Sequence, residues 1–116
     1  MLNYVEIGLG ENIARMLKEH DEAVVLDRVY RAFRAEDDRS LVIRMYKVHE
    51  IKNGENLDTP EAEVVILMGN DDDEDDQGPL IKIIAHEVHT LRVLSAISTF
   101  VLNDLSFLMS QEFEDK

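Results

Sequence analysis

Apolar residues recur at spacings of three and four between Thr90 and Met109. This spacing places residues on one face of an α-helix. It is followed by Leu91, Leu94, Ile97, Val101, Leu105 and Leu108. Further apolar residues widen this face, and the polar positions form only a narrow stripe of mostly short hydroxyl and amide side chains. A helix that is apolar on most sides is typical of a core or a subunit interface. The pattern therefore predicts one long, largely buried helix over Thr90–Met109.

A membrane span is the alternative for so apolar a stretch, because a bilayer core requires about 20 apolar residues. Arg92 and Asp104 lie inside this window. Each charge near the centre of a span costs about 2.5–3.5 kcal/mol on insertion scales. We therefore expect no membrane span.

Two shorter helices are predicted before residue 35. Ile13, Met16 and Leu17 share one helical face between Glu11 and His20. A second helix follows Asp21, because four residues repeat at i, i+3, i+4 and i+7, namely Leu26, Val29, Tyr30 and Phe33. The same stretch is rich in β-forming residues, so a strand is its alternative. The opening MLNYVEIGLG predicts a short strand or an irregular arm that ends near its glycines.

Three β-rich segments follow, at about Leu41–Ile51, Ala62–Met68 and Leu80–Glu87. The turn signal Asn53-Gly54 opens a loop of about ten residues between the first two. The last two are predicted to pair as an antiparallel hairpin across an acidic loop. The alternative is one helix that begins at Pro79 and continues to Met109, since proline favours the first helical position.

These elements predict an α+β fold for residues 1–116 as a single domain. A small antiparallel sheet of about three strands would pack with N-terminal helices and the long C-terminal helix. That helix is apolar on more sides than a small sheet can cover, which predicts a homodimer through Thr90–Met109. If the N-terminal helices enclose it instead, the protein is a monomer, and mass in solution distinguishes the two.

Charge changes this picture most. The chain has 12 Lys and Arg but 25 Asp and Glu, which gives a net charge of −13. From Asn53 onward there are 3 basic and 15 acidic residues. Such an imbalance repels nucleic-acid phosphates and anionic lipids and attracts basic surfaces. We therefore expect no direct nucleic-acid binding, no membrane binding, and a basic protein surface as the partner.

The acids are densest at about residues 70–78, where a run of like charge predicts a solvated, mobile loop. The predicted partner-binding residues are Asp71, Asp72, Asp73, Glu74, Asp75 and Asp76. An EF-hand loop requires a glycine at position 6 and a glutamate at position 12. Counted from Asp71, these positions hold Asp76 and Lys82; counted from Asp73, position 12 holds Ile84. A dedicated calcium site is therefore not predicted.

His86-Glu87-Val88-His89 resembles a metal motif, but its second histidine comes one residue too early for H-E-x-x-H. A metal shared by His86 and His89 would need a third ligand such as His49 or a carboxylate. The structural interpretation is that one histidine packs at the junction of strand and helix while the other is solvated. We predict no metal site and no cofactor.

No pattern in the chain indicates catalysis. The sequence has no cysteine and no serine in a G-x-S-x-G or S-x-x-K context, so no catalytic residue is predicted. Its first ten residues lack the cationic start and apolar run of a secretion signal, which favours a cytoplasmic location.

The leading functional hypothesis is a non-enzymatic acidic interaction module or regulator. In its sharper form, the acids imitate the phosphates of a nucleic acid and occupy the basic surface of a nucleic-acid-binding protein. The first alternative is a small metal-dependent enzyme or ligand-binding protein that uses His86, Glu87 and His89. The second is a structural subunit of a larger assembly, with the long helix buried in it.

Overall fold

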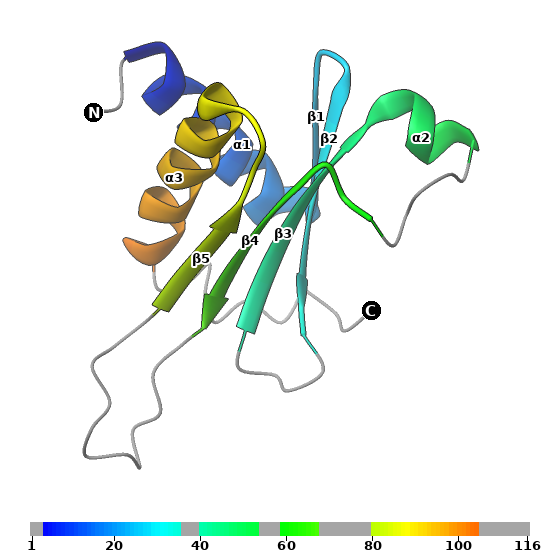
Figure 1. Ribbon diagram of the computed structural model, residues 1–116. Helices are drawn as coiled ribbons and strands as arrows, with labels where there is room; N and C mark the ends of the chain where they lie inside the picture. The colour runs from blue at the N-terminus through cyan, green and yellow to red at the C-terminus, as the bar shows by residue number, and fades with distance from the viewer. Residues whose placement is uncertain (1–3, 36–39, 54–58, 68–79, 105–116) are drawn as a thin grey trace.

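The computed structural model describes residues 4–35, 40–53, 59–67 and 80–104. These residues form three helices and five strands (Figure 1). In chain order the elements are α1 (Tyr4–His20), β1 (Glu22–Val25), β2 (Arg28–Arg34), β3 (Ser40–Lys47), α2 (Val48–Asn53), β4 (Ala62–Leu67), β5 (Leu80–Ile84) and α3 (Val88–Leu102). The predicted α+β class is confirmed.

The five strands form one antiparallel sheet in which each strand pairs with the next along the chain. This order places β3 in the centre and leaves β1 and β5 at the two edges. α1 and α3 lie together on one face of the sheet (Figure 1). The short α2 continues directly from the end of β3.

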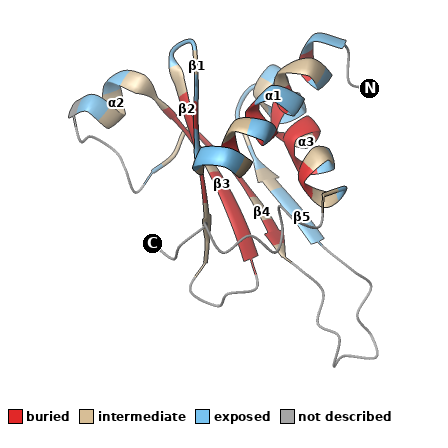
Figure 2. Ribbon diagram, turned by 180° about the vertical axis from the view of Figure 1, so that it is seen from behind, coloured by how far each residue is buried: buried red, intermediate tan, exposed pale blue. Residues whose placement is uncertain are grey.

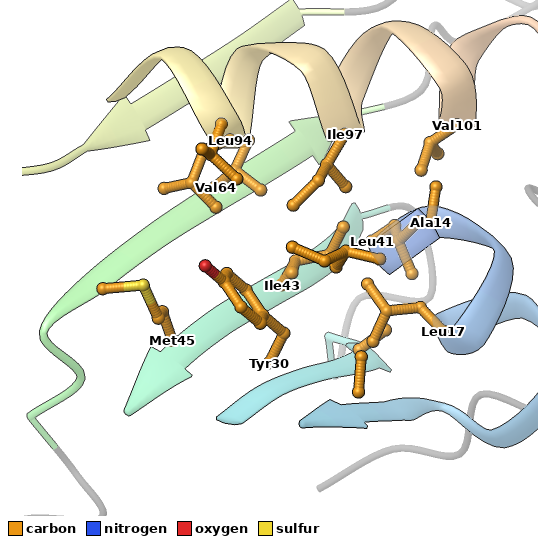
Figure 3. Packing of buried hydrophobic residues seen from close by; sticks show 14 of the residues in the cluster. Ala14, Leu17, Tyr30, Leu41, Ile43, Met45, Val64, Leu94, Ile97 and Val101 are labelled. Atoms are coloured by element: carbon orange, nitrogen blue, oxygen red, sulfur yellow. The ribbon is translucent and has the colours of Figure 1, made fainter. Parts of the chain in front are cut away.

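The hydrophobic core lies between that face and the two helices (Figure 3). Alternate strand residues point into it, as the period of two in a β-strand requires. The sheet contributes Tyr30, Leu41, Ile43, Met45, Val64 and Ile66. The helices contribute Ile13, Leu17, Leu94, Ile97 and Val101. The buried residues of α3, which are spaced by three and four, thus pack against alternate residues of β3 and β4.

α1 and α3 run side by side in the same direction. Glu6 near the start of α1 lies beside Arg92 near the start of α3, and Lys18 in the last turn of α1 pairs with Asp104 at 2.8 Å. Between these contacts, Gly10 of α1 meets Ala96 of α3, and a Cβ added to Gly10 would lie 2.5 Å from the Ala96 Cβ. The helices can approach this closely because Gly10 has no side chain.

The second predicted helix is wrong, and its strand alternative is correct. Residues 22–34 form the hairpin of β1 and β2, in which Ala23 pairs with Tyr30. Leu26 turns the chain with a positive φ of 56°. The helical spacing of Val29 and Tyr30 was misleading, because the two side chains lie on opposite faces of a strand and both are buried.

The predicted N-terminal strand or arm is also wrong, because α1 begins at Tyr4 and includes Gly8 and Gly10. Glycine weakens a helix by about 0.8–1.0 kcal/mol relative to alanine, which is why the pair suggested an end to regular structure. Packing of Gly10, Ile13 and Leu17 against α3 and the sheet outweighs that cost.

The three predicted strands are present with shorter bounds, but the sheet has five strands because the β1–β2 hairpin joins it. The segment predicted as Leu41–Ile51 ends as a strand at Lys47, and α2 takes its last residues. The predicted hairpin of β4 and β5 is confirmed by pairing of Leu67 with Leu80. One continuous helix from Pro79 is excluded, since residues 80–84 are a strand.

The long C-terminal helix is present as α3, which runs from Val88 to Leu102 and has Asn103 as its C-cap. The predicted helix is therefore wrong at residues 103 and 104, where the amide of Asp104 bonds to the carbonyl of Val101, three residues back, and the α-helical pattern stops. The predicted continuation over 105–109 lies outside the described residues. Within the part of the chain that the structure describes, no helix is both long enough and apolar enough to cross a membrane.

Candidate interaction surfaces

The predicted partner-binding residues Asp71–Asp76 lie outside the described residues, in segment 68–79 between β4 and β5. The neighbouring connection, 36–39, joins β2 to β3. Because Ser40 pairs with Leu67 and Leu67 with Leu80, both connections start and end at the same end of the sheet. α3 runs back along β5, so the C-terminal end of α3 also lies toward this end (Figure 1). We call it the acidic end.

Most of the net negative charge lies in segments of the chain that connect to the acidic end. Of the 25 acidic residues, 14 lie outside the described residues, together with two of the 12 Lys and Arg. The described body therefore keeps 11 acidic and 10 basic residues and is nearly neutral. Twelve of those 14 acids fall in segments 36–39, 68–79 and 105–116, all of which continue from the acidic end.

Strand β5 presents an unusual apolar surface. Leu80, Ile81 and Ile84 have exposed fractions of 64%, 43% and 47%. Figure 2 shows the contrast, with β5 mostly exposed and β3 mostly buried. Sequence analysis missed this surface, because the run LIKII resembles a buried strand. Its one signal was Lys82 within the run, since lysine is common on exposed edge strands.

The histidines considered as metal ligands lie at the start of α3, away from the acidic end. His86 is exposed, Glu87 is the N-cap residue of α3 without a side-chain cap bond, and His89 is 64% exposed at its side chain. His89 Nδ1 lies 3.7 Å from a carboxylate oxygen of the buried Glu6. Among the described residues there is no group of three His, Asp or Glu side chains arranged to hold a metal.

A pocket of about 190 Å³ lies near the same end, bordered by α1, the β1–β2 hairpin and α3. The Arg28 guanidinium lies on its wall and pairs with Asp27 at 2.6 Å and with Glu61 at 3.1 Å. Burial raises the pKa of the Tyr30 phenol from its ordinary value of 10.0; nearby Arg28 opposes this shift, and Glu61 and Asp27 add to it. Typical small-molecule pockets measure about 300–1,000 Å³. The pocket is therefore small, and Arg28 is held by carboxylates of the chain itself.

The face of the sheet opposite α1 and α3 carries charges that are paired with each other. Arg44 Nε lies 3.5 Å from Glu63, and its guanidinium lies 4.9 Å from the centre of the Phe33 ring. Arg31 donates a 2.7 Å hydrogen bond to Glu22. Cation–π contact and cross-strand ion pairs of this kind stabilise a sheet surface. Both arginines thus have acidic partners on this face.

Comparison of the chain with protein-family models, with curated proteins and with solved structures found no match. The two features that set this molecule apart are thus the acidic end and the apolar edge strand β5 beside it.

Proposed function

We propose that this protein is a non-enzymatic acidic interaction module that occupies a basic surface of another protein. Asp71–Asp76 are the proposed partner-binding residues, and the cytoplasm is the proposed location. The observation that carries the proposal is the separation of charge, with a nearly neutral body and twelve acids in three segments that continue from one end of it. A concentrated field of one sign accelerates association with the opposite sign.

The proposed partner is a nucleic-acid-binding protein, whose basic surface the acids would occupy in place of phosphates. In an extended chain, successive residues are spaced by about 3.3–3.6 Å. Phosphates along one DNA strand follow each other at about 3.4 Å of helix axis. A run of six consecutive acids can therefore match the charge density of a phosphate strand.

The test is competition with DNA for a core histone, used as a basic probe protein. Fluorescence anisotropy reports how much labelled duplex remains bound as the acidic protein is added. We expect the wild-type protein to release the duplex, and added salt to weaken this release. Replacement of all six residues Asp71–Asp76 by Asn or Gln should weaken release at least tenfold and flatten its salt dependence.

The matched control removes six acids from the folded body, so that both variants change the net charge equally. Its six positions are Glu11, Glu19, Glu22, Asp27, Glu50 and Glu87. We expect this control to release DNA nearly as well as the wild type. Equal losses in the two variants would eliminate the acid run as a specific site, and no release by the wild type would eliminate the proposed function.

A further inference from the structure

Among the described residues, the outer edge of β5 has no pairing partner. Within the described parts of the chain, β5 pairs only with β4, and no strand lies on its other side. An edge strand offers unpaired backbone N–H and C=O groups to any extended chain that approaches it. Four of the five residues of β5 are exposed, so its side chains are largely open.

Val88 and Leu91, at the start of α3, are also exposed. Half of the exposed large hydrophobic residues of the described chain fall within residues 80–91. A concentration of exposed apolar residues in one short stretch is more typical of an interaction site than scattered single residues are. Backbone pairing and apolar contact are thus offered by the same short stretch.

We propose that β5 is a docking strand to which an extended segment of a basic protein partner adds as a sixth strand of the sheet. The inference rests on the proposed function, because it states how the same partner is held. Main-chain hydrogen bonds to β5 would supply affinity, and contacts with Leu80 and Ile84, which lie on one face of the strand, would select apolar side chains at alternate positions. The segment carries Lys or Arg between those apolar positions and has no proline.

Charge favours this occupant over a second copy of the chain. A twofold antiparallel pairing that gives every residue of β5 a partner sets Lys82 opposite the Lys82 of the second copy, and like charges directly opposite are destabilising. A second copy also brings another run of six acids next to its own β5. A basic segment is instead attracted by the acids that directly precede β5 in the chain.

The experiment uses the full chain and a labelled peptide of alternating valine and lysine. The comparison peptide has the same charge but carries proline in place of alternate valines, which removes backbone donors needed for pairing. We expect the wild-type protein to bind the valine peptide at least tenfold more tightly. Hydrogen exchange should slow at the amides of β5 when this peptide is bound.

Protein variants separate the edge from simple charge attraction. The double variant Leu80→Glu, Ile84→Glu adds two acids, which by charge alone would strengthen binding of a basic peptide. We expect it to weaken binding at least tenfold. The matched control is Val24→Glu on the opposite edge strand, β1, where Val24 is 53% exposed and binding should not fall. The peptide comparison needs only the wild-type protein, so it stands even if the double variant fails to fold.

Equal affinity for the two peptides, no binding of the valine peptide, or full binding by the double variant would each overturn docking at β5. Failure of the proposed function has a different signature. In that case the affinity for the valine peptide would change neither with salt concentration nor with the neutralisation of Asp71–Asp76.

Discussion

Gly10 is the residue on which the contact between α1 and α3 depends. A methyl group at this position would lie 2.5 Å from the Ala96 Cβ and 3.0 Å from the Ile97 backbone nitrogen. The second of these atoms belongs to the backbone of a helix and cannot rotate away. The two helices would have to separate along a line that also holds Ile13 and Ile97 in the core.

Gly10→Ala is therefore expected to destabilise the protein by about 1–3 kcal/mol, the usual cost of overpacking a core. Gly8→Ala is the matched control, since nothing lies within 4 Å of its added methyl group. We expect this control to stabilise the helix by about 0.5–1 kcal/mol. Urea unfolding measures both, and a Gly10→Ala protein more stable than the wild type would contradict the close contact.

Tyr30 gives the fold a dependence on alkaline pH. Its side chain is 5% exposed, and burial raises its pKa above the ordinary value of 10.0 that applies in the unfolded chain. As pH rises through 10, the unfolded state loses the phenolic proton while the folded state keeps it. The free energy of unfolding therefore falls with rising pH from that point up to the folded pKa.

Tyr30→Phe should reduce this loss of stability between about pH 8 and about pH 11, because it removes the group whose pKa shifts. Urea unfolding across this range measures the effect, and absorbance of the phenolate reports the titration directly. Tyr4→Phe is the control, since it removes a phenol that is 94% exposed. If the free energies of unfolding of the wild type and Tyr30→Phe fall in parallel as pH rises, Tyr30 does not contribute to the loss of stability.

Among the elements, the β1–β2 hairpin contains a turn residue, Leu26, that tertiary packing holds against its conformational preference. Leu26 adopts a positive φ of 56° while its side chain is 93% exposed. A left-handed conformation costs a residue with a Cβ about 1–2 kcal/mol. The strain persists because Ala23, Tyr30 and Ala32 are fixed in the core.

Leu26→Gly should stabilise the protein by about 0.5–1 kcal/mol, since glycine adopts this conformation without strain. Asp21→Gly, also at a φ of 56°, serves as the comparison and should gain less, because aspartate tolerates the left-handed region better than leucine. Thermal or urea unfolding measures both changes. A loss of stability in Leu26→Gly would mean that the leucine side chain contributes contacts despite its exposure.

At the scale of the whole molecule, most of the net charge lies outside the described residues. The described body is nearly neutral, whereas the chain as a whole carries −13. Excess charge of one sign repels itself more strongly in the compact state than in the unfolded chain. Salt shortens the range of this repulsion, from about 30 Å at 0.01 M to about 3 Å at 1 M.

The wild-type protein should therefore gain stability as ionic strength rises from about 0.01 M to about 0.5 M. The variant with Asp71–Asp76 neutralised should gain less, because six of its repelling charges are gone. Chemical unfolding at the two salt concentrations checks this expectation. If both proteins gain the same stability with salt, repulsion among Asp71–Asp76 does not destabilise the folded state.

The homodimer through Thr90–Met109 remains a prediction. α1 and the sheet bury one side of α3, and Val88 and Leu91 are the exposed large apolar residues of this helix. Native mass spectrometry measures the outcome. A mass of twice 13.3 kDa that Leu91→Glu returns to 13.3 kDa would support the dimer, and 13.3 kDa for the wild type would exclude it.

The sequence by itself determined the elements whose pattern agrees with their packing. The short apolar run of β4 predicted a strand, and the three-and-four spacing of Leu94, Ile97 and Val101 predicted a helix with one buried face, so local pattern and tertiary structure coincide there. The run of acidic residues before β5 is also evident from the sequence alone, because charge is a property of composition.

Only the tertiary structure decided that residues 4–10 are helical and that residues 22–34 are a hairpin. In the first case the contact of Gly10 with Ala96 comes from residues far away in the chain. In the second, burial of both Val29 and Tyr30 from opposite faces of β2 erased the alternation that marks a half-buried strand. The exposure of β5 was decided in the same way, since its place at the sheet edge follows from the order of all five strands.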